Sequence, residues 1–442
     1  MQELFFVFKL PVWAGWPTAA PAAPGPFPGP AMQTPTQPTI VLLGALDTKG
    51  PELGFVAEAL SRRGWPVRLL HIGIREPAAL PASLAGADIR HVDVAPGELA
   101  ALGKVPAMAR IAATAGPQLV DWLARGEIAG VLALGGGVGT WVGAEAMRAL
   151  PFGFPKLVVS TLPYDIRPLL HGRDIVFFSS VADILGLNPE LRAVLANAVA
   201  AIDGMARTWT PLSGEAIAHT LGATGLGITT PALLAARDSI EAAGFELASF
   251  HANGLGGAAF EEWIGQRMFR GVLDLTTSEL TSEIFGGIAT AGPERLTTAG
   301  RLGVPQVVCP GGLDIVSRGP LAGLDPTDRA RPHYAHSPTF THVRIDAAGM
   351  RKVAGVLAAR LNAAIGPTAF ALPLRGFSAE SRPGGAIHDP AADEAFRSEL
   401  RARLAPTVAL VEVDAHINDP VFVRRACDLL FEQLGVPIPD TH

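Results

Sequence analysis

The chain has 442 residues, a formal net charge of −6 and a sequence pI near 6.0. This length exceeds what one ordinary hydrophobic core requires, so we expect two or three domains. No basic block occurs, which argues against nucleic acid as a partner. The 2 cysteines lie far apart and have no metal-ligand spacing, as is typical of reduced thiols in a cytoplasmic protein.

Hydrophobic residues make up 49% of the chain, but every apolar run is interrupted before it reaches the roughly 18 residues that a membrane span requires. We therefore expect no membrane segment. Residues 1–38 are rich in Pro, Ala and Gly and predict a disordered leader. Because Met32 lies just before the first expected strand, we expect residues 1–31 to be either dispensable or the result of a start codon assigned too early.

From Thr39 onward, the pattern alternates between strands and helices. Short apolar runs predict strands at 40–46, 67–74, 130–134, 156–162, 175–181, 225–228, 245–252, 271–275, 306–309, 369–374 and 408–413. Pro51 opens one of the intervening helices, and Thr276 with Glu279 predicts a capping box for another. Such alternation is typical of parallel sheets. We expect two doubly wound, Rossmann-like α/β domains at 39–205 and 206–442, the first binding nucleotide.

In two segments of the first half, an apolar strand is followed directly by a turn and then by a helix. Their candidate ligand-binding residues are Asp47, Thr48, Lys49 and Gly50 in the first turn, and Gly135, Gly136, Gly137, Gly139 and Thr140 in the second. Such turns expose backbone N–H groups, and the following helix directs its positive end to the same place. The sequence therefore predicts a phosphate or carboxylate site, with Ser160 and Thr161 at the end of the next strand.

Within this site, Asp47 is suited to face a metal-bound phosphate or a ribose hydroxyl. Neither turn matches a standard fingerprint, because the spacings of G-x-G-x-x-G and G-x-x-x-x-G-K-[ST] are both absent. The glycines could serve only to form tight turns, with Lys49 a solvated residue at a helix start. Two such turns in one domain favour a ligand over this alternative.

The second half places His251, Asp274 and His416 after predicted strands, where they are candidates for acid, base or metal-facing roles. A lone histidine is more often a hydrogen-bonded structural residue, so this alternative stays open. Neither zinc-ligand spacing nor G-x-S-x-G is present, and we expect no metal site built from protein ligands alone.

Ordered motifs at 43–50, 155–161, 186–188, 272–277, 373–376 and 414–420, together with the glycine run before Thr140, resemble an uncharacterised, Tm-one-like bacterial family. That family is similar to the ATP-binding inhibitory region of the tomato mosaic virus resistance protein. The resemblance extends from about Thr39 to the C-terminus. It implies two α/β subdomains, ATP binding with Mg²⁺, and self-association into a homo-oligomer. Because some relatives carry a fused TIM barrel, it also implies a separate barrel protein as a partner.

The chain departs from the family pattern in both ligand loops. Relatives have Gly-Gly-Ser-Gly-Gly-Thr where this chain has Val138 after three glycines, and they have a longer loop where this chain has residues 160–168. The β-branch of Val138 resists the positive φ that glycine tolerates, and Pro163 removes an N–H donor. These changes predict weaker nucleotide binding or a preference for another anion.

Three functions stay open from the sequence. The first is an ATP-binding protein with its ligand near the interdomain cleft. The second is a metabolic enzyme that acts on a small carboxylate or phosphorylated acid. The third is a catalytically idle subunit that regulates a partner. The sequence does not decide whether the protein is an enzyme.

Overall fold

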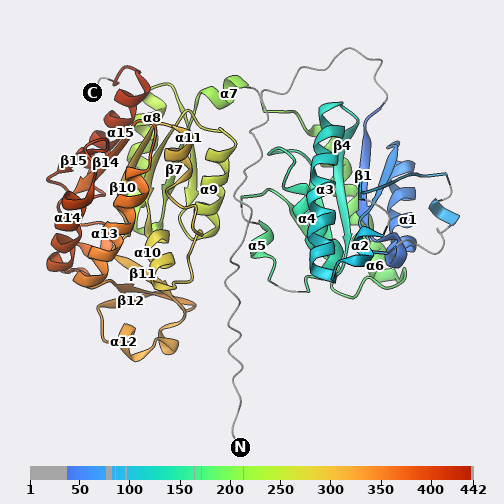
Figure 1. Ribbon diagram of the computed structural model, residues 1–442, viewed down its shortest axis with the longest axis horizontal. Coiled ribbons are helices and arrows are strands. Elements are labelled where there is room, and N and C mark those ends of the chain that lie inside the picture. The colour runs from blue at the N-terminus through green and yellow to red at the C-terminus, as the bar shows by residue number, and fades with distance from the viewer. Residues whose placement is uncertain are drawn as a thin grey trace, which may run out of the picture.

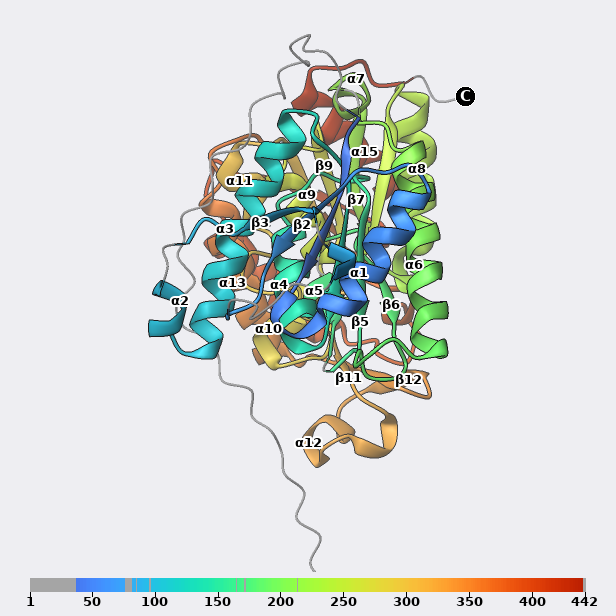
Figure 2. The same cartoon turned by 90° about the vertical axis from the view of Figure 1, so that its right-hand side faces the viewer.

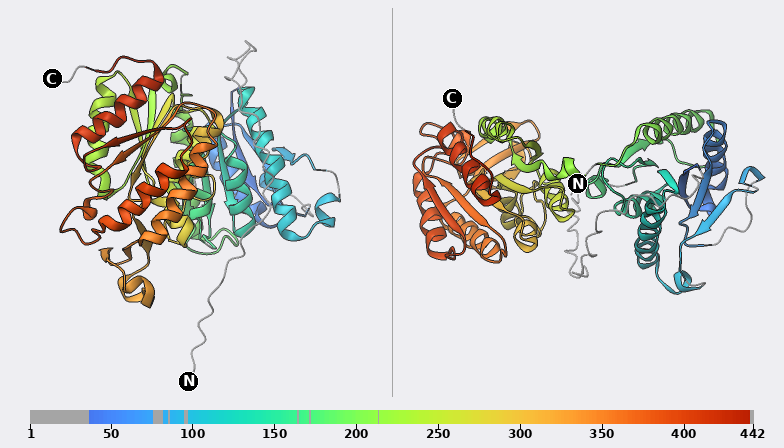
Figure 3. Two further views of the ribbon diagram at one scale, coloured as in Figure 1. Left: turned by 60° about the vertical axis from the view of Figure 1, so that its left-hand side comes forward. Right: turned by 90° about the horizontal axis from the view of Figure 1, so that it is seen from above.

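The computed structural model describes residues 37–75, 82–84, 86–94, 97–163, 165–170, 172–212 and 214–439. The expected leader at 1–38 therefore lies outside the described residues, apart from residues 37 and 38. The described chain forms two parallel six-stranded sheets and one small antiparallel sheet (Figure 1). Helices cover both faces of each large sheet (Figure 3). The expected Rossmann-like α/β architecture is confirmed.

The N-terminal sheet has the strand order β3-β2-β1-β4-β5-β6, and all its pairings are parallel. Its strands are β1 (Thr39–Gly44), β2 (Val67–His71), β3 (Asp88–His91), β4 (Ile128–Gly135), β5 (Lys156–Ser160) and β6 (Val176–Ser179). Its helices are α1 (Leu46–Arg62), α2 (Glu98–Ala101), α3 (Lys104–Ala124), α4 (Gly137–Met147), α5 (Arg167–Leu170) and α6 (Pro189–Thr208). Helices α1 and α6 pack on one face, and α3 and α4 pack on the other (Figure 2).

The C-terminal sheet has the strand order β15-β14-β10-β9-β7-β8, again all parallel. Its strands are β7 (Thr220–Gly225), β8 (Glu246–His251), β9 (Gly271–Thr276), β10 (Gln306–Gly311), β14 (Thr368–Pro373) and β15 (Ala409–Val413). The helices of this half are α7 (Gly214–Ala218), α8 (Thr230–Ala242), α9 (Leu255–Gly265), α10 (Ser278–Phe285), α11 (Thr298–Leu302), α12 (Pro326–Arg329), α13 (Ala347–Asn362), α14 (Pro390–Arg403) and α15 (Pro420–Leu434).

A three-stranded antiparallel sheet, which the sequence pattern did not predict, follows β10. It consists of β11 (Ile315–Arg318), β12 (His333–Ser337) and β13 (Phe340–Arg344) in the order β11-β13-β12. Strand β3 also escaped prediction, because its residues are only partly buried and show little apolar alternation. The expected strand at 225–228 lies earlier in the chain, at β7, whose small residues Gly222 and Ala223 weaken the apolar signal.

The carboxyl ends of both large sheets face the same side of the molecule. Strand β1 enters its sheet from the top in Figures 1 and 2, and α7, which precedes β7, also lies at the top. The small sheet and α12, which follow β10, lie at the bottom in both views. Any ligand site at the strand ends of either sheet therefore opens toward the bottom of these views.

Contacts between the halves lie near the C-terminal end of α4. Glu262 of α9 pairs with Arg173 and lies 3.5 Å from Arg148. The rings of Phe152 and Trp263 have centroids 4.1 Å apart. Since Arg148 and Phe152 follow the last residue of α4, these contacts lie at the opposite end of that helix from the Gly136 turn.

Candidate functional site

The two predicted turns lie side by side at the point where the strand order of the N-terminal sheet reverses. Strands β1 and β4 are direct neighbours, with Gly44 opposite Leu134, and their crossovers lead to opposite sides of the sheet. The order 3-2-1-4-5-6 is that of the dinucleotide-binding fold, whose ligands bind outside the carboxyl ends of the strands at this switch point. The sequence identified both turns, but it did not show that β1 pairs with β4.

The turn after β1 is fixed by backbone and histidine contacts. The N–H groups of Thr48 and Lys49 donate to the Ala45 carbonyl at 3.1 and 2.8 Å, and the Leu46 N–H donates to His71 Nδ1 at 3.1 Å. Lys49 has φ −127° and ψ 20°, which are not helical values, so the regular part of α1 begins at Gly50 and Pro51. The expectation that Pro51 opens this helix is thereby met.

Asp47 points from this turn toward the end of β2. Its side chain is 14% exposed, and its Oδ2 lies 3.8 Å from Arg75 Nε. Its Oδ1 is buried and has no hydrogen-bond partner among the described residues. A Cβ on Gly73 would lie 2.6 Å from that oxygen, so a larger residue there would require the Asp47 side chain to move. A buried carboxylate oxygen without a partner is the kind of group that a cation or hydroxyl ligand satisfies.

Lys49 and Glu52 connect α1 to the loop after β6. The Lys49 ammonium donates to the Ile184 carbonyl, and the Gly186 N–H donates to Glu52 Oε1 at 2.7 Å. Because an ammonium has three donors, this contact leaves Lys49 able to bind an anion as well. The sequence motif 186–188 thus meets the Lys49 turn in space, which its position in the chain did not reveal.

The turn after β4 brings the N-terminus of α4 directly onto the strand end. A Cβ on Gly135 would lie 3.0 Å from Gly139 Cα, and one on Gly139 would lie 2.7 Å from the Leu134 carbonyl oxygen. These two glycines are therefore required for close packing of helix against strand. Gly136 has φ −80° and ψ −146°, is only half-buried and provides no side-chain cap for α4. Since the first N–H groups of a helix lack intrahelical partners, this turn directs backbone donors to the sheet edge.

Val138 does not distort this turn. It lies within the first turn of α4, outside the set of residues with positive φ, and packs against the core of the N-terminal half. The sequence predicted that the β-branch of Val138 would resist a positive φ. Because the residue is helical in the structure, no positive φ is required of it. Its N–H group remains part of the helix N-terminus.

The hydroxyl residues of the predicted site divide into two groups. Thr140 and Ser160 are fully buried, and their hydroxyl oxygens lie 2.6 Å apart. Thr140 also donates to the Gly135 carbonyl at 3.1 Å, so this pair holds the turn together. By contrast, Thr161 is half-buried, and its Oγ1 would lie 3.8 Å from a Cβ on Gly136. Thr48 is exposed. Thr161 and Thr48 are the hydroxyls that a ligand could reach.

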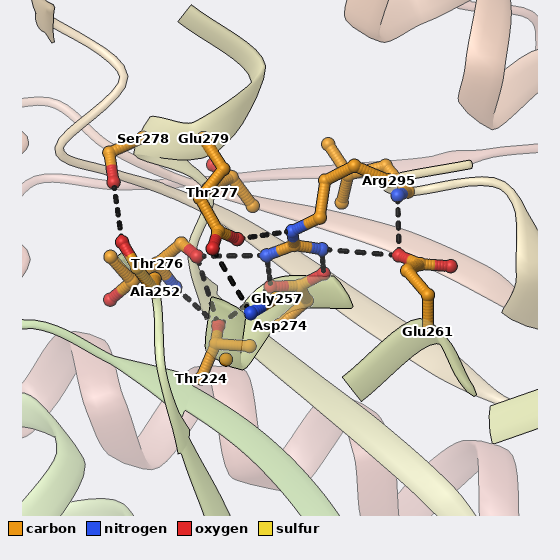
Figure 4. A network of polar contacts seen from close by, with 12 residues as sticks. Thr224, Ala252, Gly257, Glu261, Asp274, Thr276, Thr277, Ser278, Glu279 and Arg295 are labelled. Carbon is orange, nitrogen blue, oxygen red and sulfur yellow. Dashed lines mark hydrogen bonds and ion pairs between the residues drawn. The ribbon is translucent and has the colours of Figure 1, made fainter. Parts of the chain in front are cut away.

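In the C-terminal half, Asp274 belongs to a buried ionic network around Arg295. The guanidinium Nη2 donates to Asp274 Oδ1 at 2.7 Å, and Nε donates to Glu279 Oε2 at 2.7 Å. Nη1 lies 3.3 Å from Glu261 Oε1 (Figure 4). Thr224 also donates to Asp274 Oδ1 at 2.7 Å. All the oxygens that make these contacts are turned inward, so Asp274 holds the sheet to its flanking segments.

Burial sets the protonation of this network. Burial raises the pKa of Glu261 and of Glu279, although Arg295 opposes the rise in both. Burial acts to lower the pKa of Arg295, but Asp274 and Glu279 raise it well above its ordinary value. One cation thus faces three carboxyl groups, and burial opposes the ionisation of Glu261 and Glu279 while Arg295 favours it.

Glu279 does not form the capping box predicted with Thr276. Thr277 is the N-cap residue of α10 and makes no side-chain cap bond. Glu279 Oε1 instead accepts the N–H groups of Gly254 and Gly257, at 2.6 and 3.0 Å, at the start of α9. A Cβ on Gly257 would lie only 1.8 Å from Glu279 Oε2. The capping prediction was wrong because a tertiary contact with α9 and Arg295 competes for the carboxylate.

His251 and His416 lie apart from this network and from each other. His251 is exposed at the end of the edge strand β8. His416 is buried; its Nε2 donates to the Ser378 carbonyl at 2.8 Å, and its Nδ1 accepts the Asn418 N–H at 3.1 Å. Burial lowers the pKa of His416, so it is held neutral with both nitrogens bonded. The structure does not bring His251, Asp274 and His416 together into one site.

The switch point of the C-terminal sheet, between β7 and β9, is filled by side chains. The hydroxyl oxygens of Thr229 and Thr276 lie 2.7 Å apart, and both residues are fully buried. Asn418 donates to the Ile228 carbonyl at 2.9 Å and accepts the Ala232 N–H at 3.3 Å. The 3₁₀ turn Gly227–Thr229 is thereby fixed against the loop after β15.

A surface groove of about 1090 Å³ lies along α13 and includes none of the predicted site residues. Within the described ranges, no cluster of three or more His, Cys, Asp or Glu residues is arranged to hold a metal ion. None of the helices in the described part of the chain is long and apolar enough to cross a membrane.

Two domain models of the "Uncharacterised protein family (UPF0261)" match the chain in succession, the N-terminal model at residues 38–211 and the C-terminal model at 218–434. A UPF0261 protein of Clostridium tetani is 35% identical over 87% of this chain and 96% of its own length. The chain belongs to the UPF0261 family. A member from Brucella suis is 34% identical over 88% of this chain and 94% of its own length.

The UPF0261 chain is also similar to a plant protein, as the sequence motifs indicated. The ToMV resistance protein Tm-1(GCR237) of Solanum lycopersicum is 33% identical over 69% of this chain, which spans 42% of that protein. Among solved structures, MurG of Acinetobacter baumannii matches 62% of this chain and 79% of its own, with 14% identity and a TM-score of 0.22. That score is too low to support an inference about fold or function.

Proposed function

We propose that the protein binds ATP together with Mg²⁺ at the carboxyl edge of the N-terminal sheet. The observation that carries this proposal is the pairing of β1 with β4, which brings the Lys49 and Gly136 turns together at the switch point. The N-terminus of α4 and the Lys49 ammonium supply donors for phosphate oxygens, and both turns are accessible. The family resemblance supports ATP among the phosphate ligands that would fit.

Asp47 supports the inclusion of Mg²⁺. Its Oδ1 is a buried carboxylate oxygen without a partner in the described chain, beside the Lys49 turn. Magnesium in nucleotide sites is typically held by one or two carboxylates together with phosphate oxygens, so a dedicated cluster of protein ligands is not required. When bound, the cation would neutralise phosphate charge, and Asp47 would hold it.

Isothermal titration of the full chain with ATP in the presence of Mg²⁺ tests this proposal. Lys49→Met removes one cation from the site, and Asp47→Asn removes the carboxylate charge. Since a hydrogen bond to a charged group contributes about 1.5–3 kcal/mol, we expect each variant to weaken ATP binding by roughly tenfold or more. Only Asp47→Asn should also reduce the dependence of binding on Mg²⁺.

Lys352→Met provides a matched control. Lys352 is an exposed residue of α13 whose ammonium lies over the Phe285 ring, far from the switch point in the fold. Its replacement also removes one positive charge, so it reports any effect of net charge alone, and we expect unchanged ATP affinity. The proposal fails if wild-type protein shows neither heat nor thermal stabilisation with millimolar ATP and Mg²⁺.

A further inference from the structure

The same local conformation occurs at the ends of β5 and β6. At each strand end a serine Oγ accepts the N–H of the residue two positions later: Ser160 accepts from Leu162 at 2.9 Å, and Ser179 accepts from Val181 at 3.2 Å. Leu162 has φ 48° and Val181 has φ 61°. Because Ser160 and Ser179 are register partners, these two turns stand next to each other at the sheet edge.

Both aliphatic residues occupy a conformation that is unfavourable for them. Positive φ brings Cβ close to the backbone carbonyl, and the β-branch of Val181 makes this worse. Leu162 also precedes Pro163, a position that favours extended backbone. Val181 is 92% exposed and Leu162 is 38% exposed. The strain at Val181 is thus not offset by burial of its side chain, and strain of this kind is found at binding sites.

The pair lies next to the proposed phosphate site. Gly135 at the end of β4 is the register partner of Ser160, so the edge runs from the Lys49 turn at β1, through the Gly136 turn at β4, to Leu162 and Val181. Neighbouring strands are about 4.8 Å apart, which places both side chains within roughly two strand spacings of α4. The two aliphatic residues therefore follow the two strands that lie next to the strand carrying the Gly136 turn.

We propose that Leu162 and Val181 form an apolar platform that binds the flat ring of the nucleotide, with its phosphates bound at the Gly136 and Lys49 turns. Aliphatic side chains pack well against the faces of aromatic rings, which hydrate poorly. The two serine bonds hold the platform in its strained form before the ligand arrives. This inference rests on the proposed function and assigns the ring to the β5 and β6 side of the site.

Titrations with two ligands separate the platform from the phosphate site. One ligand is ATP with Mg²⁺ and the other is inorganic triphosphate with Mg²⁺, which has no ring. In wild-type protein we expect ATP to bind at least tenfold more tightly than triphosphate. Val181→Asn should weaken ATP binding about fivefold and leave triphosphate binding unchanged. Because asparagine tolerates positive φ, the same variant should also have a higher melting temperature.

Ile365→Asn is the matched control, because Ile365 is 78% exposed in a loop of the C-terminal half. We expect it to bind both ligands as wild type does. The inference is overturned if Val181→Asn and Leu162→Asn bind ATP as tightly as wild-type protein. It is also overturned if the variants change the sedimentation of the protein without changing ATP affinity, because that result would assign the two residues to contacts between copies of the chain. If neither ligand binds to wild-type protein, the proposed function itself fails.

Discussion

The carboxyl edges of the two large sheets differ in what occupies their switch points. In the N-terminal half, the Lys49 and Gly136 turns are half-buried, and a carboxylate oxygen of Asp47 has no partner in the described chain. In the C-terminal half, Thr229 and Thr276 bond to each other in the interior, and Asp274 is paired with Arg295. The two switch points therefore differ, because the N-terminal one has an unpartnered carboxylate oxygen at Asp47, whereas Thr229 and Thr276 at the C-terminal one bond to each other.

This difference shows that residues after parallel strands cannot be assigned to ligand binding by position alone. Asp47 and Asp274 both lie at or near the end of a central strand, yet only Asp274 has a buried arginine beside it. A carboxylate with an internal partner stabilises the fold, whereas one without a partner is available to a cation. The comparison predicts stability effects in the C-terminal half and binding effects in the N-terminal half.

The largest effect is expected from Arg295→Met. Removing this guanidinium leaves Asp274, Glu261 and Glu279 buried without their counter-charge, and breaking a buried ion pair costs about 3–5 kcal/mol. We expect a loss of this size in the free energy of unfolding, measured by urea denaturation. Arg301→Met is the control, since Arg301 is 51% exposed and lies 3.9 Å from Glu294; such a pair contributes about 0–1 kcal/mol. Equal losses in the two variants would contradict the structural role of the network.

The next effect is a pH dependence that originates at Asp314. Burial raises the pKa of Asp314 to about 6, despite Arg344 at 3.0 Å, and Asp393 adds to the rise. A carboxyl group with a higher pKa in the folded than in the unfolded chain stabilises the fold at pH values below its unfolded pKa, which is near 4. This stabilisation is lost as the pH rises through the folded pKa of about 6. Relative to Asp314→Asn, wild-type protein should lose on the order of 2 kcal/mol between pH 4 and pH 7.

Urea midpoints for both proteins across this pH range check the expectation. Asparagine keeps the shape of the side chain and can still accept from Ser378 and Arg344, which contact Asp314 Oδ2 in the native protein. A constant difference between the two proteins across the range would show that Asp314 has an ordinary pKa. A wild-type protein that gains relative stability as pH rises would contradict the assigned sign.

A smaller effect is expected when the filled switch point loses a hydroxyl. Thr276→Val keeps the side-chain shape but removes the hydrogen bond to Thr229. A typical hydrogen bond contributes about 1 kcal/mol to the free energy of unfolding. Thr48→Val makes the same change at the N-terminal edge, where the side chain is exposed, and should alter stability by less than about 0.5 kcal/mol. Chemical denaturation of both variants measures the difference in their stability losses. A larger loss for Thr48→Val than for Thr276→Val would contradict the comparison of the two edges.

The smallest effect on stability, with a gain in binding, is expected from Gly137→Ser. This change restores the hydroxyl that the family pattern has at the first position of α4. A serine there is compatible with the helix start and adds a donor beside the Gly136 turn. ATP affinity measured by titration should rise by up to roughly tenfold, with stability changed by less than about 0.5 kcal/mol. A weaker affinity would place the phosphates elsewhere.

Much of the fold could be predicted from the sequence, because apolar runs and glycine or proline signals are local. The strand expected at 156–162 is observed as β5, and the helix expected to begin at Pro51 is observed as the part of α1 that follows the non-helical Lys49. The small antiparallel sheet escaped prediction, since its strands mix His, Ser and Arg with few apolar residues. Register and strand order depend on packing between distant segments, and no local pattern encodes them.

The site could be predicted only in part for the same reason. Both turns were identified, but the network of Asp274 with Arg295 joins residues from separate elements. The strain at Leu162 and Val181 was also invisible, because it arises from the turns that follow paired strands. No local signal marks Arg295 as buried, because it directly follows Glu294 in a stretch that contains Gly292 and Pro293.

Hydrogen–deuterium exchange with and without ATP and Mg²⁺ tests the central claim most directly, because it reports the two edges in one experiment. The N-terminal edge is represented by residues 46–53 and 136–141, and the C-terminal edge by residues 224–230 and 276–282. We predict that nucleotide slows exchange at the N-terminal edge and leaves the C-terminal edge unchanged. Slower exchange confined to the C-terminal edge, or no change at either edge under saturating ATP, would contradict the account.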